Sequence, residues 1–279
     1  MHTIEELFSL KDKVIIITGG MGLLGKSYAE AISIAKGNPV IADIRLDKAD
    51  QFLKELENKT GKEGLACEVD ITSERSVENL VDQTLDKFGR INGLINNAAL
   101  TIAKGSKELK EYFSPFETYP LELWKLAIDT NISGMFIVTQ KIGIEMKKNP
   151  DGGSIVNIAS TYGLVSPDQR IYQGIKSQYG ETAFNTPIGY ATTKSAVLNF
   201  TRYLATYWAK NKIRVNTLTP GGVFDGHDET FVKNYSYRVP MGRMAERNEY
   251  QGAIIFLLSN ASSYMTGANL IVDGGWTCW

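Results

Sequence analysis

Cysteine and histidine are both scarce in this chain, which has two of each among 279 residues. The two cysteines, Cys67 and Cys278, are too few for a disulfide framework or a cysteine-based metal site. His227 stands in the acidic stretch DGHDE at 225–229, a pattern that could hold a metal but is more typical of a solvated segment. We therefore expect a reduced, cytoplasmic protein that binds no metal.

The chain also lacks an excess of charge of one sign and a long apolar run. Its formal net charge is −1, so the charge balance indicates neither a nucleic acid nor an anionic membrane as partner. No apolar stretch is long enough to span a bilayer, and the acidic segment 1–13 does not resemble a signal peptide. Hydrophobic residues make up 43% of the chain, which is enough for a substantial core, and the expected partner is a small molecule.

Short β-branched segments alternate with longer amphipathic segments along the whole chain. This alternation predicts a parallel sheet that is covered by helices on both faces. With no repeat or linker, we expect one domain over 1–279, interrupted by two polar and aromatic inserts at 100–120 and 161–188. The segments expected to form strands are 13–20, 38–44, 63–71, 91–99, 152–160, 213–221 and 269–275.

The motif TGGMGLLG at 18–25 lies between the first expected strand and a helix. Gly19, Gly22 and Gly25 would let the backbone turn sharply and approach a pyrophosphate at the start of that helix. Structural turns use the same residues, but Asp43 follows at the end of the second strand, where a carboxylate can bind a ribose diol. Because Asp43 would repel a 2′-phosphate, the pattern favours NAD over NADP.

A tyrosine and a lysine stand four residues apart in PIGYATTKSA at 187–196. This spacing places Tyr190 and Lys194 on one face of a helix, where an ammonium group would lower the pKa of a phenol. Such pairs are also common on solvated helix faces, so the pair alone does not establish an acid–base function.

Several motifs occur in the same order as in the short-chain dehydrogenase/reductase family. NNAA at 96–99 resembles the Asn-Asn-Ala-Gly strand end of that family, and DGGW at 273–276 resembles its closing motif. The resemblance implies a single-domain, Rossmann-type doubly wound sheet of about seven strands, with a dinucleotide-binding part at 12–160 and a catalytic part at 160–279. The cofactor contacts that it implies are Gly19, Gly22, Leu24, Gly25, Asp43, Ile44, Asp70, Ile71, Asn97, Ala98, Tyr190, Lys194, Pro220, Gly221 and Val223.

The resemblance also implies catalytic roles. Tyr190 would be the general acid or base, and Lys194 would keep the pKa of Tyr190 low and hold the nicotinamide ribose. Ser160 would donate a hydrogen bond to the substrate oxygen, and Asn131 would position a water molecule that links Lys194 to solvent. The family also pairs the helices that correspond to 121–148 and 189–210, so we expect a homo-oligomer, a tetramer or a dimer.

The sequence departs from the family pattern at two places. Ala99 replaces the usual glycine, and the insert at 161–188 separates Ser160 from Tyr190 by more than the usual distance. The insert contributes three rival tyrosines, but none of them has a lysine four residues later on a helix. These rivals are Tyr162, Tyr172 and Tyr179.

The glycine motif, the insert and the tryptophan-containing end resemble the flagellin-modification A proteins, which are linked to bacterial nonulosonic-acid glycans. The insert is rich in hydrogen-bonding side chains, which favours a polyhydroxylated substrate such as a sugar derivative over an acyl chain. The alternative functions are a 3-oxoacyl carrier reductase or another short-chain alcohol dehydrogenase, and, from another class, a catalytically silent NAD-binding sensor or scaffold. The insert could instead serve as a mobile lid or a subunit contact. The candidate substrate-binding residues are Ser160, Arg170, Tyr172 and Arg238.

Overall fold

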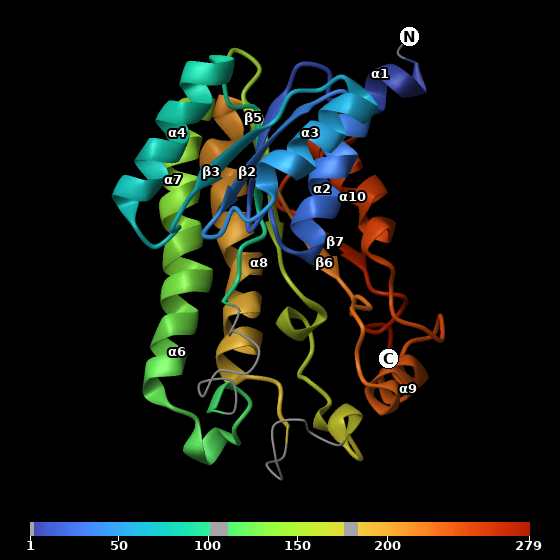
Figure 1. Cartoon of the computed structure of the whole chain (residues 1–279). Helices are drawn as coiled ribbons and strands as arrows, with labels where there is room; N and C mark the ends of the chain where they lie inside the picture. The colour runs from blue at the N-terminus through green and yellow to red at the C-terminus, as the bar shows by residue number, and fades with distance from the viewer. Residues whose placement is uncertain (1–2, 101–110, 176–183) are drawn as a thin grey trace.

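The computed structural model describes residues 3–100, 111–175 and 184–279 (Figure 1). Within these residues seven strands form one sheet in the order β3-β2-β1-β4-β5-β6-β7, and every neighbouring pair is parallel. The predicted α/β fold is therefore confirmed, and each strand lies inside a segment expected to form one. The strands are β1 (Val14–Thr18), β2 (Asn38–Asp43), β3 (Leu65–Glu68), β4 (Gly93–Asn96), β5 (Gly153–Ile158), β6 (Ile213–Pro220) and β7 (Asn269–Val272).

Helices cover both faces of the sheet (Figure 1). Alternate side chains of β1 enter two separate cores, Ile15 and Ile17 on one face and Val14 and Ile16 on the other. The first face packs against α2 (Leu23–Ile34), α3 (Ala49–Thr60) and α10 (Gln251–Leu258). The second face packs against α4 (Glu74–Phe88), α7 (Met135–Met146) and α8 (Ile188–Trp208). Further α-helices are α1 (Ile4–Phe8), α6 (Leu121–Ile128) and α9 (Glu229–Arg238). Among the described residues, no helix has the length and apolar character that crossing a membrane requires.

The order of the strands reverses between β1 and β4. From β1 the chain runs outward through β2 to β3, and it then returns to place β4 on the other side of β1. Connections from the carboxyl ends of these two central strands therefore lead in opposite directions. In open α/β sheets this reversal leaves a crevice at the carboxyl ends of the strands, where ligands bind.

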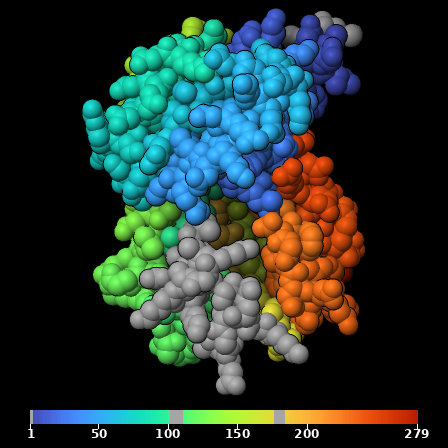
Figure 2. Space-filling model, in the orientation of Figure 1, coloured from blue at the N-terminus to red at the C-terminus, as the bar shows by residue number. Residues whose placement is uncertain are grey.

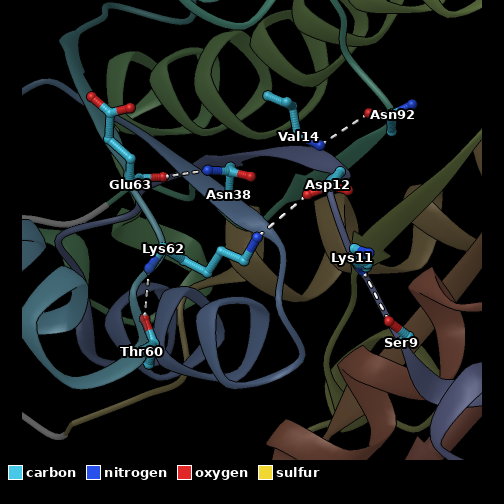
Figure 3. A network of polar contacts seen from close by, with 9 residues as sticks. All are labelled: Ser9, Lys11, Asp12, Val14, Asn38, Thr60, Lys62, Glu63 and Asn92. Atoms are coloured by element: carbon cyan, nitrogen blue, oxygen red, sulfur yellow. Dashed lines mark hydrogen bonds and ion pairs between the residues drawn. The ribbon is translucent and has the colours of Figure 1, made fainter.

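The opposite edge of the sheet, where the strands begin, is closed by polar contacts (Figure 3). The side-chain oxygen of Asn92 accepts a hydrogen bond from the backbone nitrogen of Val14 at 3.0 Å. The side-chain nitrogen of Asn38 donates to the carbonyl oxygen of Glu63 at 2.8 Å. These contacts satisfy a backbone group at the start of β1 and another just before β3, so they contribute to the fold rather than to a site.

The segment 121–148, expected to be one long helix, is helical but not uniform. A π-helical turn, η2 (Asp129–Gly134), separates α6 from α7. Such turns are rare and occur mostly at functional sites. In this chain the turn contains Asn131, which the sequence marked as a candidate site residue.

Candidate functional site

The glycine turn after β1 has the shape that a dinucleotide phosphate needs. Gly19 adopts a positive φ of 62°. A Cβ atom on Gly25 would overlap the carbonyl oxygen of Gly19, so only glycine fits at that position. Gly22 is the N-cap of α2, and it has no side chain that could accept hydrogen bonds from the first N–H groups of the helix. Leu24 is in the first turn of this helix. These N–H groups can therefore bind an anion.

Asp43 ends β2, and its carboxylate reaches back to the glycine turn. Its Oδ2 atom accepts a hydrogen bond from the backbone nitrogen of Met21 at 2.9 Å, and Oδ1 accepts one from the backbone nitrogen of Arg45 at 3.1 Å. The carboxylate is therefore held beside the expected phosphate position, with the exposed side chain of Ile44 next to it. This is where the adenosine ribose of a dinucleotide lies in folds of this type.

Thr18 joins the carboxyl ends of the two central strands. Its hydroxyl oxygen accepts hydrogen bonds from the backbone nitrogens of Asn97 and Ala98, both at 3.1 Å. In return the Asn97 side-chain nitrogen donates to the carbonyl oxygens of Thr18 and Gly19, both at 3.0 Å. The sequence analysis did not single out Thr18, although its place between an apolar strand and the glycines was a usable signal.

Asp70 and Ile71 follow β3 at the same edge of the sheet. The Oδ1 atom of Asp70 accepts hydrogen bonds from the backbone nitrogen and hydroxyl of Thr72, at 2.9 and 2.7 Å. Ile71 is buried and lies against Gly134 of the π-helical turn, where a Cβ atom would come within 2.8 Å of the Ile71 side chain. The structure thus places this pair beside η2, and their contact with adenine remains a prediction.

Strand β5 and helix α8 bring Ser160, Tyr190 and Lys194 together. Ser160 follows the end of β5, while Tyr190 and Lys194 lie one turn apart near the start of α8. The Ser160 hydroxyl lies close enough to that of Tyr190 to affect its pKa. The buried Nζ atom of Lys194 lies 5.8 Å from the centroid of the Tyr190 ring and donates to the carbonyl oxygen of Ile158 at 2.7 Å.

Burial dominates the acid–base properties of Tyr190 and Lys194. Burial raises the pKa of Tyr190, and the nearby hydroxyl of Ser160 opposes that rise. Burial lowers the pKa of Lys194 to about 8. The low pKa expected for Tyr190 is therefore not found in this geometry. Loss of contact with water disfavours the charged form of each group, so it raises the pKa of the phenol and lowers the pKa of the lysine. The Nζ atom of Lys194 is hydrogen bonded to the carbonyl of Ile158.

The side chain of Asn131 connects three parts of the site. Its oxygen accepts a hydrogen bond from the backbone nitrogen of Leu100 at 2.7 Å, and its nitrogen donates to the hydroxyl of Thr193 at 2.9 Å. Asn131 therefore joins the π-helical turn to the segment after β4 and to α8, beside Lys194. The water molecule that Asn131 was expected to position stays a prediction.

Pro220 is the last residue of β6, and Gly221 and Val223 follow it in the turn beyond the strand. Helix α9 holds this turn, since the backbone nitrogen of Gly222 donates to the hydroxyl of Tyr235 at 2.6 Å. The ring of Tyr235 in turn stacks on the buried ring of Trp276 near the C-terminus, with centroids 4.4 Å apart. The sequence analysis assigned no role to Tyr235 or Trp276.

Arg170 and Arg238, expected near the substrate, meet at a single carboxylate. Arg170 donates two hydrogen bonds of 2.8 Å to Asp168, and Arg238 of α9 forms an ion pair with the same carboxylate at 3.2 Å. The Arg238 guanidinium also lies over the ring of Trp276, 5.4 Å from its centroid. The hydrogen bonds from Arg170 lower the pKa of Asp168 to about 2. This cluster joins the insert to α9.

The DGHDE segment forms the N-terminal cap and first residue of α9. The Oδ1 atom of Asp228 accepts hydrogen bonds from the backbone nitrogens of Thr230 and Phe231, at 2.9 and 3.2 Å. The ring of His227 stacks on that of Phe231, with centroids 5.1 Å apart. Within residues 3–100, 111–175 and 184–279, no three His, Cys, Asp or Glu side chains are grouped so that they could hold a metal ion.

The two inserts meet above the site. The rings of Phe113 and Phe184 stack with centroids 4.0 Å apart, and the backbone nitrogen of Asn185 donates to the carbonyl oxygen of Phe113 at 3.2 Å. Figure 2 shows a recess between the blue N-terminal part, the green side that contains α6 and the orange region of α9. Of the three rival tyrosines, Tyr162 and Tyr172 lie in the described part of the insert, and Tyr179 lies outside the described residues.

Residues 13–173 match the family described as "short chain dehydrogenase", and residues 174–277 match the one described as "Enoyl-(Acyl carrier protein) reductase". The chain belongs to the short-chain dehydrogenase/reductase family. The resemblance drawn from the ordered motifs is thereby confirmed, and the protein is an oxidoreductase of that family.

Relatives in this family carry diverse names. Post-translational flagellin modification protein A of Campylobacter coli is 28% identical over 267 residues, covering 96% of this chain and 99% of that protein. NAD-dependent glycerol dehydrogenase of Listeria innocua is 30% identical over 278 residues, covering 97% and 96%. Peroxisomal 2,4-dienoyl-CoA reductase of Danio rerio is 31% identical over 275 residues, covering 95% and 82%.

Solved short-chain dehydrogenases have the same fold over nearly their whole length. One from Leptospira borgpetersenii with bound NAD⁺ is 29% identical, with a TM-score of 0.81, and 99% of this chain and 96% of that one are covered. Gluconate 5-dehydrogenase of Burkholderia cenocepacia, in complex with NADP and tartrate, is 27% identical with a TM-score of 0.82, covering 99% and 100%. The neighbours thus include both an NAD complex and an NADP complex.

Proposed function

We propose that this oxidoreductase uses NAD to transfer a hydride at a CH–OH or carbonyl group of a polyhydroxylated substrate, a sugar derivative of bacterial surface-glycan biosynthesis. The observation that carries the proposal is that Ser160, Tyr190 and Lys194 come together beside hydroxyl groups of the insert at 161–188. The Tyr172 hydroxyl lies 2.9 Å from that of Thr186, which is four residues before Tyr190, and Tyr162 is two residues after Ser160.

Each of the three central side chains has a separate task. When bound, NAD supplies the acceptor for the hydride, and its reduced form supplies the donor. Tyr190 removes the proton from the substrate hydroxyl during oxidation and returns it during reduction. Ser160 donates a hydrogen bond to the substrate oxygen and stabilises the negative charge that develops there. Lys194 holds the nicotinamide ribose.

The preference for NAD rests on the placement of Asp43. Both of its carboxylate oxygens accept backbone hydrogen bonds, which fixes the group beside the glycine turn. Each oxygen retains a lone pair that can accept a hydrogen bond from a ribose hydroxyl. A 2′-phosphate at the same place would face a fixed negative charge, so NADP should bind less tightly.

A polar substrate is favoured over an acyl thioester by the hydroxyl groups of Tyr162, Tyr172 and Thr186. After the hydrogen bond between Tyr172 and Thr186 they retain hydrogens and lone pairs for a ligand, and an alkyl chain provides no partner for these. Two relatives, one named as a glycerol dehydrogenase and one as a flagellin modification protein, support a polar substrate. The relative named for dienoyl-CoA supports the alternative of an acyl-thioester reductase. In the cluster of Arg170, Arg238 and Asp168 two positive charges face one negative charge, which would suit an anionic group on the substrate.

A second copy of the chain is the proposed protein partner, in a dimer or tetramer. Large apolar and aromatic side chains are exposed along the segment from α6 to α7 and along α8, and one sheet face does not cover them. Helical faces of this kind pack in symmetric homo-oligomers. The exposed side chains are Leu121, Leu126, Phe136, Ile144, Tyr203 and Tyr207.

The test is a screen of NAD-coupled turnover with the purified chain. The panel contains glycerol, threitol, arabinitol, sugars and their phosphate esters, together with 3-hydroxyacyl thioesters. The proposal expects turnover of polyols or sugars with kcat/KM above that of every thioester. Preference for thioesters would establish the alternative reductase, and tight NAD binding without turnover of any compound would indicate a sensor or scaffold.

A further inference from the structure

The Tyr172 hydroxyl lies at the start of the helix that carries Tyr190. It is 2.9 Å from the hydroxyl oxygen of Thr186, a buried residue directly before the N-cap of α8 at Pro187. Thr186 is four residues before Tyr190, whose backbone nitrogen donates to the carbonyl oxygen of Pro187 at 3.1 Å. One helical turn rises only about 5.4 Å, so the Tyr172 hydroxyl is held near the reacting group.

The ring of Tyr172 packs against two other aromatic rings. It stacks on Phe231 of α9 with centroids 5.6 Å apart and an interplanar angle of 17°. Phe184 contacts it with centroids 4.7 Å apart. The short helix η4 (Gln169–Tyr172) is held as well, because the Asn234 side chain donates to the carbonyl oxygen of Ile171 at 3.1 Å. Such contacts restrict the ring, so the direction of its hydroxyl is preorganised.

Tyr162 lies in the turn that directly follows Ser160. Its backbone nitrogen donates to the hydroxyl oxygen of Ser160 at 3.3 Å. At the next residue, Gly163, a Cβ atom would come within 2.5 Å of the Lys194 carbonyl oxygen, so this turn lies directly on α8. The hydroxyl groups of Tyr162 and Tyr172 lie close enough for each to affect the pKa of the other.

These contacts bring together three hydroxyl groups, those of Tyr162, Tyr172 and Thr186. Three hydroxyls supply three hydrogens, and the hydrogen bond between Tyr172 and Thr186 uses one of them. Two hydrogens and several lone pairs therefore remain for a ligand. Because these hydroxyls lie between Ser160 and the start of α8, a ligand bound through its oxygen at Tyr190 would present its other groups to them.

We infer that the hydroxyl groups of Tyr162, Tyr172 and Thr186 form a subsite for a second hydroxyl of the substrate, on a carbon other than the one that reacts. The inference rests on the proposed function, because it requires a substrate with more than one hydroxyl. It goes further by naming Tyr172 as the residue that distinguishes a polyol from a simple alcohol. A simple alcohol has no second hydroxyl to bind these three groups. Sites that bind a hydroxyl of the substrate strongly reject analogues that lack it.

The test compares Tyr172→Phe with the unmutated protein on matched pairs of substrates. The pairs are threitol with butan-2-ol, and cyclohexane-1,2-diol with cyclohexanol, which differ only in their number of hydroxyls. The substitution removes one oxygen atom and keeps the ring between Phe231 and Phe184. Tyr237→Phe is the control, because Tyr237 is on the same helix as Phe231 and its side chain is 89% exposed.

Tyr172→Phe should lower kcat/KM for the polyols by roughly tenfold or more, mainly by raising KM, and should leave the simple alcohols unchanged. Where a simple alcohol is not turned over, a raised polyol KM with a conserved kcat is the supporting result. Equal losses on both members of a pair, an unchanged polyol KM, or a loss of the same size in Tyr237→Phe would overturn the subsite. Absence of polyol and sugar turnover in the unmutated protein would instead refute the proposed function.

Discussion

The Nζ atom of Lys194 donates a hydrogen bond of 2.7 Å to the carbonyl oxygen of Ile158 in the interior of the protein. This contact fixes the lysine beside Tyr190, but it does not replace the water that an exposed ammonium group would bind. The pKa of Lys194 therefore falls to about 8. A group that titrates this close to neutral pH should affect both the stability and the activity of the protein.

The free energy of unfolding should depend on pH because Lys194 is buried. Below about pH 8 both the folded and the unfolded chain carry the ammonium, so the full cost of burial is present. Between about pH 8 and 10.5 the folded chain is deprotonated first, so the unfolded chain binds more protons and stability rises with pH. From about pH 7.5 to 10, the unmutated chain should gain about 2 kcal/mol in free energy of unfolding relative to Lys194→Met.

Urea unfolding at a series of pH values measures this gain. Lys147→Met is the matched control, because Lys147 is exposed on the same protein and should show no such trend. A difference between the unmutated chain and Lys194→Met that stays constant over this pH range would contradict the lowered pKa.

Tyr190→Phe should keep the fold and the binding of NAD, and should lose turnover by roughly 10²-fold or more, the scale of general acid–base catalysis. Tyr162→Phe and Tyr172→Phe should retain most of kcat, because their hydroxyls bind the substrate but do not exchange its reacting proton. Steady-state kinetics of the three variants decide the assignment. Retained turnover in Tyr190→Phe, with loss in one of the others, would show that the acid was misassigned.

The two directions of the reaction should respond differently to pH. Oxidation requires Tyr190 in its deprotonated form, and burial raises the pKa of that phenol. The initial rate of oxidation should therefore increase with pH through the alkaline range, whereas reduction, which uses the protonated phenol, should not increase. Initial rates in both directions across this range provide the measurement, and a rate of oxidation that falls as pH rises would argue against Tyr190 as the base.

NAD should bind more tightly than NADP, and Asp43→Ala should reduce the difference by removing the charge that faces a 2′-phosphate. Asp47→Ala is a control, since Asp47 is four residues further along the chain and exposed. Dissociation constants for both cofactors at one ionic strength test the prediction. Tighter binding of NADP by the unmutated protein would refute it.

Phe136→Lys should weaken the association of chains, because Phe136 is half exposed on α7 and a lysine there would bring like charges together in a symmetric contact. Light scattering at micromolar concentration should show a dimer or tetramer for the unmutated protein and a lower mass for the variant. A monomeric unmutated protein would disprove the expected oligomer.

The repeated pattern of apolar strands and amphipathic helices was sufficient to predict the sheet. Side chains that are buried on both faces produce near-continuous apolar runs, as in β1, so such central strands were visible without tertiary information. The order of the motifs likewise indicated the family, because turns such as that at Gly19 and Gly25 restrict the residue type locally. The π-helical turn around Asn131 was not predicted, since its pattern of side chains resembles that of an ordinary helix.

The sequence by itself therefore determined where the strands lie along the chain, the glycine turn, Asp43 and the pair of Tyr190 and Lys194, because each depends on residues that are near neighbours in the chain. Only the tertiary structure decided what surrounds that pair. The contact of Phe113 with Phe184 joins residues that are far apart in the sequence. The pKa of Tyr190 was wrongly expected to be low, because desolvation depends on every element packed around the phenol and not on the lysine one turn away.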